Sequence, residues 1–75
     1  MFEEIRQRIL EASHSNQKIA MFHYQVLLNA NNLINVDPVE FCDAVGVPQS
    51  YATEFRKMLS LAQLMRDNNA RIQGN

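Results

Sequence analysis

Three side chains of this sequence, one cysteine and two histidines, have the chemistry for nucleophilic or metal-assisted catalysis. Cys42 has no neighbouring base in the sequence and lies in no thiol motif, which favours a small core residue. His14 and His23 are nine positions apart, without the spacing of a histidine metal site, and one cysteine with two histidines is too few for structural zinc. We therefore expect no enzyme activity, no metal and no cofactor.

Two glycines, Gly46 and Gly74, are too few for a phosphate-cradling loop, which removes another common kind of catalytic site. His23 falls within an apolar helical stripe, where a core or interface histidine is the favoured interpretation. His14 falls in a polar break between helices and is expected at the surface. Function therefore has to be sought in surfaces rather than in a reactive centre.

The elements that position these residues are all helices. Apolar residues recur at steps of three and four, which predicts an all-α, compact four-helix domain with helices over about 2–12, 17–30, 38–45 and 49–68. We expect one domain over residues 1–70 and a polar, frayed tail over residues 71–75. A core of this size supplies roughly 3–5 kcal/mol of stability, and a single cysteine excludes an internal disulfide.

The third helix has the clearest boundaries. Asp37 is a good N-cap, Pro38 suits the first helical position, and Glu40 can close a capping box. Gly46 supplies the left-handed residue that ends such a helix. The sequence therefore predicts a short helix, a tight turn and a further helix over residues 37–57.

This segment resembles the helix-turn-helix of phage-repressor-type, lambda-repressor-like DNA-binding proteins. In that family a small residue faces the partner helix, a glycine makes the turn, an apolar residue follows, and two inward residues lie three apart. The corresponding positions here are Cys42, Gly46 and Val47, followed by Ala52 and Phe55. The resemblance covers residues 37–57 and implies a corner of two helices whose second member enters the major groove.

The resemblance also implies contacts with double-stranded DNA. Gln49 would read a base, because glutamine can bond adenine through two hydrogen bonds. Ser50 and Thr53 would reach bases or phosphates, and Arg56 and Lys57 would bind backbone phosphates. A small bacterial or phage transcription regulator is the function expected from this resemblance.

The charge pattern keeps a second function open. The net charge is −1, and four acids lie near the expected DNA face: Asp37, Glu40, Asp43 and Glu54. Cations are what neutralise phosphate, so acids on that face weaken binding to any duplex. The alternative is a protein-interaction or oligomerisation module, an adaptor, inhibitor or N-terminal domain of a longer protein, with no nucleic-acid role.

The last helix carries more apolar surface than one small core needs. A seam at steps of four and three includes Tyr51, Phe55 and Ala62, and further leucines lie outside it. We expect a homodimer or another protein partner on this helix, through Met58, Leu61, Leu64 and Met65.

Composition places the chain among ordinary globular proteins. Hydrophobic residues make up 47%, which argues against disorder. No apolar run has the length of a membrane span, and the first residues read as a helix rather than as a secretion signal. No membrane association and a cytoplasmic location are therefore expected, in agreement with a lone cysteine.

Overall fold

Two helical layers build the fold, one from the early part of the chain and one from its late part. A computed structural model describes residues 1–70; the predicted tail over 71–75 lies outside these residues. The helices are α1 (Phe2–Ser13), α2 (Lys18–Leu28), α3 (Ala30–Leu33), α4 (Pro38–Val45) and α5 (Ala52–Asp67), with a 3-10 turn, η1 (Gln49–Tyr51), before α5. The described residues contain no strand, and the all-α prediction is confirmed.

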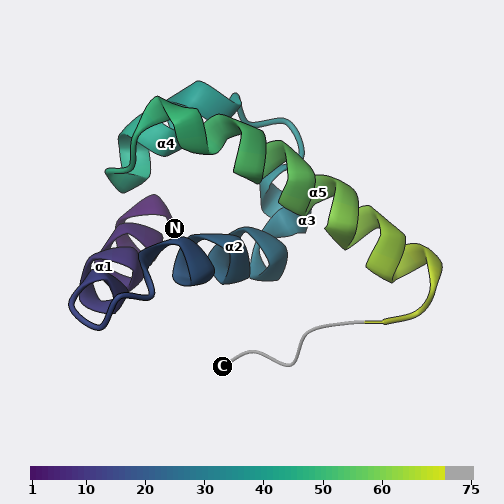
Figure 1. Ribbon diagram of the computed structural model, residues 1–75. Coiled ribbons are helices and arrows are strands. Elements are labelled where there is room, and N and C mark those ends of the chain that lie inside the picture. Colours follow the sequence, from purple (N-terminus) through teal and green to yellow (C-terminus); the bar gives the residue numbers. More distant parts are fainter. Residues whose placement is uncertain (71–75) are drawn as a thin grey trace.

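The α1–α2 hairpin forms one layer, and α4 with α5 forms the other (Figure 1). Helix α1 packs against α2 and α4, and α2 also packs against α5. The short helix α3 crosses from one layer to the other and contacts α5. Helix α5 is the longest element, and its C-terminal part extends past the end of α2 (Figure 1).

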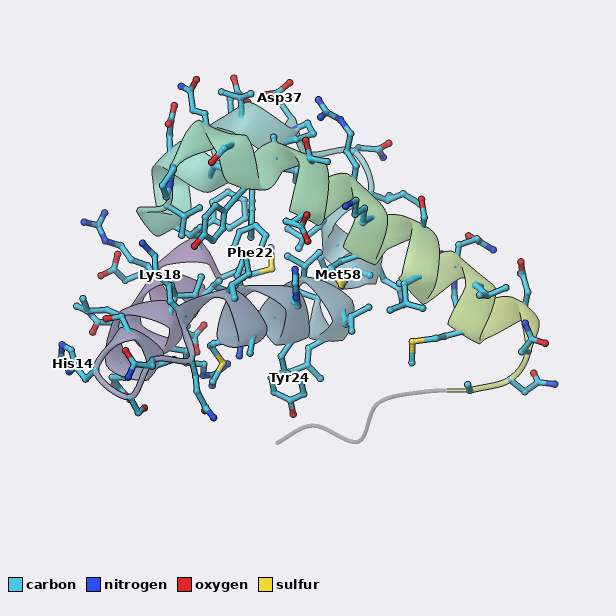
Figure 2. The ribbon with its side chains drawn as sticks, viewed as in Figure 1. His14, Lys18, Phe22, Tyr24, Asp37 and Met58 are labelled. Atoms are coloured by element: carbon cyan, nitrogen blue, oxygen red, sulfur yellow. The ribbon has the colours of Figure 1, made fainter. Side chains whose placement is uncertain are left out.

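Aromatic rings hold the two layers together. Phe22 of α2 points into the space between them (Figure 2), and it is fully buried, as are Phe41 of α4 and Phe55 of α5. The centroid of the Phe41 ring lies 4.8 Å from that of Phe55, 5.8 Å from that of Phe22 and 5.5 Å from that of Phe2. Rings in edge-to-face contact add about 0.5–1.5 kcal/mol per pair beyond the area they bury.

The second helix ends two residues before its predicted bound of about residue 30. It ends at Leu28, and Asn29 leaves helical geometry with φ −106° and ψ 14°. The Asn29 side chain donates to the Gln25 carbonyl at 2.8 Å, and its backbone amide donates to the same oxygen at 3.1 Å. Asparagine bonds to nearby backbone in this way and weakens a continuing helix. Helix α3 then starts in a new direction.

The start of the last helix also differs from its prediction. Residues 49–51 form a 3-10 turn in which the Tyr51 amide donates to the Pro48 carbonyl at 3.0 Å, and α-helix begins at Ala52. Such tight turns are frequent at helix N-termini. The turn shifts the first α-helical residue three positions later than residue 49.

Candidate nucleic-acid interface

The corner between α4 and α5 is built by local interactions at both ends of α4. The Asp37 carboxylate accepts a hydrogen bond from the Glu40 amide at 3.0 Å, as the N-cap prediction requires. Gly46 adopts φ +77° and ψ 33°, a left-handed conformation that glycine takes without strain. The Val47 amide then donates to the Cys42 carbonyl at 3.0 Å, and the Gly46 amide to the Asp43 carbonyl at 3.4 Å. This pair of bonds is a Schellman stop, and it turns the chain sharply toward η1.

Inward side chains of the corner match their predicted positions. Cys42, Val47, Ala52 and Phe55 are all buried, each at less than a tenth of its full exposure. Burial raises the pKa of the Cys42 thiol, the neighbouring Asp43 raises it further, and Arg56 opposes the shift. Cys42 is therefore a protonated core thiol at neutral pH, without the exposure that a nucleophile needs.

The outward side chains of the same segment gather at the N-terminal end of the second helix. Five polar side chains are exposed there: Gln49, Ser50, Thr53, Arg56 and Lys57. Arg56 and Lys57 follow Thr53 by three and four positions, so each is a neighbour of Thr53 on the side of α5 away from Phe55. The five predicted contact residues are thus all exposed on η1 and the first turns of α5, and we call this set of residues the reading surface.

One of the four acids near this surface is engaged by other side chains. The Glu54 carboxylate lies 2.8 Å from the His23 ring nitrogen Nε2 of α2 and 3.3 Å from the Lys57 amine. The hydrogen bond with His23, followed by that with Lys57, lowers the pKa of Glu54 below its ordinary value. His23 is half-buried, and its place is therefore an interhelical contact between α2 and α5. Glu40 and Asp43 remain exposed on α4.

Two cations that the sequence pattern did not single out border the corner. The Arg6 guanidinium of α1 lies over Gly46, with Nε 3.6 Å from the point where a Cβ would stand. Lys18, at the start of α2, places its amine 5.7 Å from the centre of the Tyr51 ring. Only the packing of α1 and α2 against the corner brings these residues here, so helical periodicity carries no signal for them.

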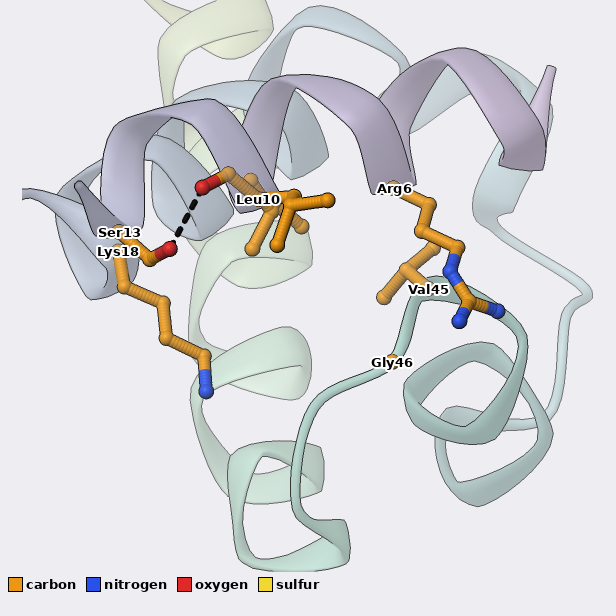
Figure 3. Close-up of a pocket in the computed structure, with 7 residues that line it drawn as sticks. Arg6, Leu10, Ser13, Lys18, Val45 and Gly46 are labelled. Carbon is orange, nitrogen blue, oxygen red and sulfur yellow. Dashed lines mark hydrogen bonds between the residues drawn. The ribbon is translucent and has the colours of Figure 1, made fainter.

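A cavity of about 150 Å³ separates these cations. Figure 3 shows Arg6 and Lys18 at opposite ends of it, with Leu10 between them. Ile9, Ser13, Val45 and Gly46 complete the lining. Among the described residues that line it, only Arg6 and Lys18 carry charge, so the cavity is bordered by positive charge alone.

The four side chains expected at a dimer interface fall into two groups. Met58 points toward α2 (Figure 2) and packs against the core, and Met65 is also half-buried. Leu61 and Leu64 are exposed at 38% and 58%. An uncovered apolar surface is therefore present at these two leucines, whereas much of the Met58 surface is already used within the chain.

No group of three or more potential metal-binding side chains occurs within residues 1–70. Within the same residues, no helix combines the length and the apolar character needed to cross a membrane. His14 is exposed at the α1–α2 turn (Figure 2).

Comparison with known proteins identifies the type of domain. A family model described as an HTH-like domain matches residues 1–68. No curated protein and no solved structure gives a match. The chain belongs to this helix-turn-helix-like family, and the match includes α1 and α2 as well as the corner itself.

Proposed function

We propose that the chain is a non-enzymatic, double-stranded DNA-binding regulator of bacterial or phage type. The observation that carries this proposal is the exposure of all five residues of the reading surface directly after the glycine turn of a helix-turn-helix-like domain. In helix-turn-helix proteins the residues at this end of the second helix reach base edges in the major groove.

Each side chain of the reading surface has a chemistry that suits this role. Gln49 carries the amide that bonds adenine through two hydrogen bonds. Ser50 and Thr53 carry hydroxyls that can meet a base or a phosphate, and Arg56 and Lys57 carry charges that neutralise phosphates. We assign specificity chiefly to Gln49 and general affinity to the two cations.

The charge of the corner also supports binding at low salt. Glu54 is held by His23 and Lys57, so its carboxylate is partly neutralised. The exposed acids Glu40 and Asp43 belong to α4, whereas the reading surface belongs to η1 and the first turns of α5. We expect binding that is weak on random sequences and strongly salt-dependent.

Fluorescence anisotropy with a labelled mixed-sequence duplex of about 20 base pairs tests the proposal, beginning at about 50 mM salt. Arg56→Gln is expected to weaken binding on every sequence and to reduce the slope of log K against log salt by about 0.9. Arg66→Gln, which removes the same charge near the other end of α5, is the control. Absence of duplex binding by the wild-type chain would overturn the proposal.

Selection from a randomised duplex library gives the preferred sequence and tests the role of Gln49. Gln49→Ala is expected to relax the preference at one base pair, at a cost of about 1–3 kcal/mol on the selected sequence. Ser60→Ala, at an exposed position beyond the reading surface, should leave that preference unchanged. An unaltered preference in Gln49→Ala would remove the base-reading role.

We further propose a homodimer through α5, supported by the exposed Leu61 and Leu64. If two α5 helices cross antiparallel at these leucines, the two η1 turns lie roughly 34–37 Å apart along the helix axes, because a helix rises about 1.5 Å per residue. One turn of B-DNA spans about the same distance, which is the half-site spacing of dimeric helix-turn-helix proteins. Met58 and Met65 would contribute the part of their surface that the core leaves uncovered.

The same two leucines favour a second candidate function, a protein-interaction module without a nucleic-acid role. Its binding surface would be the apolar end of α5. Gln49 and Arg56 would not be needed for this function. Leu61→Asp would then abolish association, while added duplex would have no effect on the wild-type chain. A duplex titration and an association assay on the same samples separate the two functions.

A further inference from the structure

Two basic residues from the first third of the chain lie at either end of the turn that leads into the reading surface. Arg6 covers Gly46, where the turn begins, and Lys18 stands over Tyr51, where η1 ends. The backbone from 46 to 51 therefore runs between two cations, and Gln49 and Ser50 are exposed within that run.

The positive charge of both residues is left without an acidic partner by the rest of the described chain. The ion pairs within residues 1–70 join the N-terminus to Glu4, and His23 and Lys57 to Glu54. Neither Arg6 nor Lys18 takes part in any of them. In this respect they differ from Lys57, which must share its charge with Glu54.

Packing fixes where the two charges lie. The Arg6 guanidinium lies over Gly46, where Nε would be 3.6 Å from a Cβ added to that glycine. The face of the Tyr51 ring attracts the Lys18 amine, and Tyr51 is itself held by Phe22 at 5.1 Å between ring centroids. Arg6 therefore lies beside the start of the turn, and Lys18 lies beside its end.

We propose that Arg6 and Lys18 form a phosphate clamp that binds the DNA backbone next to the bases contacted by Gln49 and Ser50. This inference rests on the proposed function. A nucleic-acid backbone suits the clamp because the cavity is bordered by two cations and no acid, and because the turn between these cations carries the exposed polar side chains of Gln49 and Ser50. With Arg56 and Lys57, the clamp raises the number of cations at the interface to four.

Salt dependence measures the clamp directly. Each neutralised phosphate contributes about −0.9 to the slope of log K against log salt. Four contacts predict a slope of about −3.6 for the wild-type chain, and Arg6→Gln/Lys18→Gln should reduce its magnitude by about 1.8. The probe is a fluorescein-labelled mixed-sequence duplex of about 20 base pairs, titrated at several salt concentrations.

The matched control is Arg8→Gln/Arg66→Gln, which removes two positive charges from other surfaces. Arg8 lies beside Gln25, and Arg66 beside Asn31 and Gln63, both away from the turn. Arg6→Lys/Lys18→Arg keeps both charges and should retain the wild-type slope. Circular dichroism melts establish that each variant is folded. If the double variant unfolds, Arg6→Gln alone replaces it, because this change leaves the contact between Lys18 and Tyr51. Arg6→Gln should reduce the magnitude of the salt slope by about 0.9.

The clamp is supported if Arg6→Gln/Lys18→Gln loses the expected slope while Arg8→Gln/Arg66→Gln changes it little. Equal losses in the two double variants would mean that total charge alone sets affinity; the clamp would then be overturned and the DNA-binding proposal would stand. No duplex binding by any protein, including the wild type, would overturn the DNA-binding proposal and the clamp together.

Discussion

Gly46 acts at the corner through its backbone. Its φ of +77° lets the chain leave α4, and the Arg6 guanidinium lies over it. A Cβ at this position would meet Arg6 Nε at 3.6 Å, an ordinary contact, so the cost of a side chain lies in the backbone.

Gly46→Ala should therefore lower the free energy of unfolding by about 1 kcal/mol, since an L-residue is strained in the left-handed region. Gly46→Asn is the matched variant and should lose less, because asparagine tolerates this conformation. Urea unfolding followed by circular dichroism gives both values. Equal stability of Gly46→Ala and the wild type would contradict the left-handed turn.

Glu54 makes stability depend on pH. Its pKa is lowered by His23 and then by Lys57, so the folded chain favours the carboxylate. The resulting stability is fully present above the ordinary pKa of 4.5 and is lost as the pH falls through the lowered value.

Glu54→Gln should consequently have a lower Tm than the wild type at neutral pH and a shallower loss of Tm in acid. Thermal melts between about pH 7 and pH 3 measure both effects. Glu11→Gln, a change at an exposed residue of α1, provides the comparison. A Tm difference between Glu54→Gln and wild type that is the same at about pH 3 as at about pH 7 would contradict a stabilising role for the charge of Glu54.

The bounds of helix α4 could be predicted from local sequence signals alone. The predicted bounds, 38–45, are those of the structure, because the cap, the proline and the glycine stop all lie within or next to the helix. The apolar periodicity gives no sign of the break at Asn29, because it continues through this residue to Ala30, whereas a side-chain hydrogen bond to Gln25 accompanies the end of the helix.

Packing between helices explains why some side chains are more or less buried than helical spacing predicts. Helical spacing puts Ile19 on the same face of α2 as the buried Phe22 and Val26, yet Ile19 is 43% exposed, whereas the polar Gln25 is 2% exposed. Gln25 is satisfied by Arg8 of α1 at 3.5 Å, a partner seventeen positions away. Arg6 and Lys18 likewise reach the corner only through the tertiary fold, whereas the five residues of the reading surface could be named because they follow the glycine turn directly.

At the scale of elements, a leucine in the one-turn helix α3 and a leucine near the end of α5 are expected to contribute very differently to stability. Leu33 is fully buried, so Leu33→Ala should cost about 2–5 kcal/mol. Leu64 is 58% exposed, and Leu64→Ala should change stability by less than about 0.5 kcal/mol. Urea unfolding of the two variants compares them, and similar losses would contradict the distinct environments of these leucines.

At the scale of the whole molecule, the reading surface and the exposed leucines occupy different lengths of η1 and α5. Lys57, Leu61 and Leu64 follow one another at steps of four and three, so basic and apolar side chains share one side of this helix. Thr53 and Leu64 are about 16 Å apart along the axis. A partner seated on the leucines can therefore leave η1 and the first turn of α5 accessible.

Sedimentation velocity tests the dimer at this scale. We expect a species of twice the 8.7 kDa chain mass for the wild type, and a single-chain mass for Leu61→Asp/Leu64→Asp. Ile34→Asp, at a 59% exposed position between α3 and α4, should remain dimeric. A monomeric wild-type chain at about millimolar concentration would exclude the dimer, since affinities weaker than this correspond to less than about 4 kcal/mol of binding free energy.

The place of Tyr51 also gives the molecule an internal optical reporter. The chain has no tryptophan and two tyrosines, Tyr51 beside the turn and Tyr24 projecting from the opposite side of α2 (Figure 2). In Tyr24→Phe, ultraviolet emission arises from the Tyr51 ring alone, which packs on Phe22 beneath the Lys18 amine. Opening of η1, or the arrival of an ultraviolet-transparent polyanion, can then be followed in the unlabelled protein.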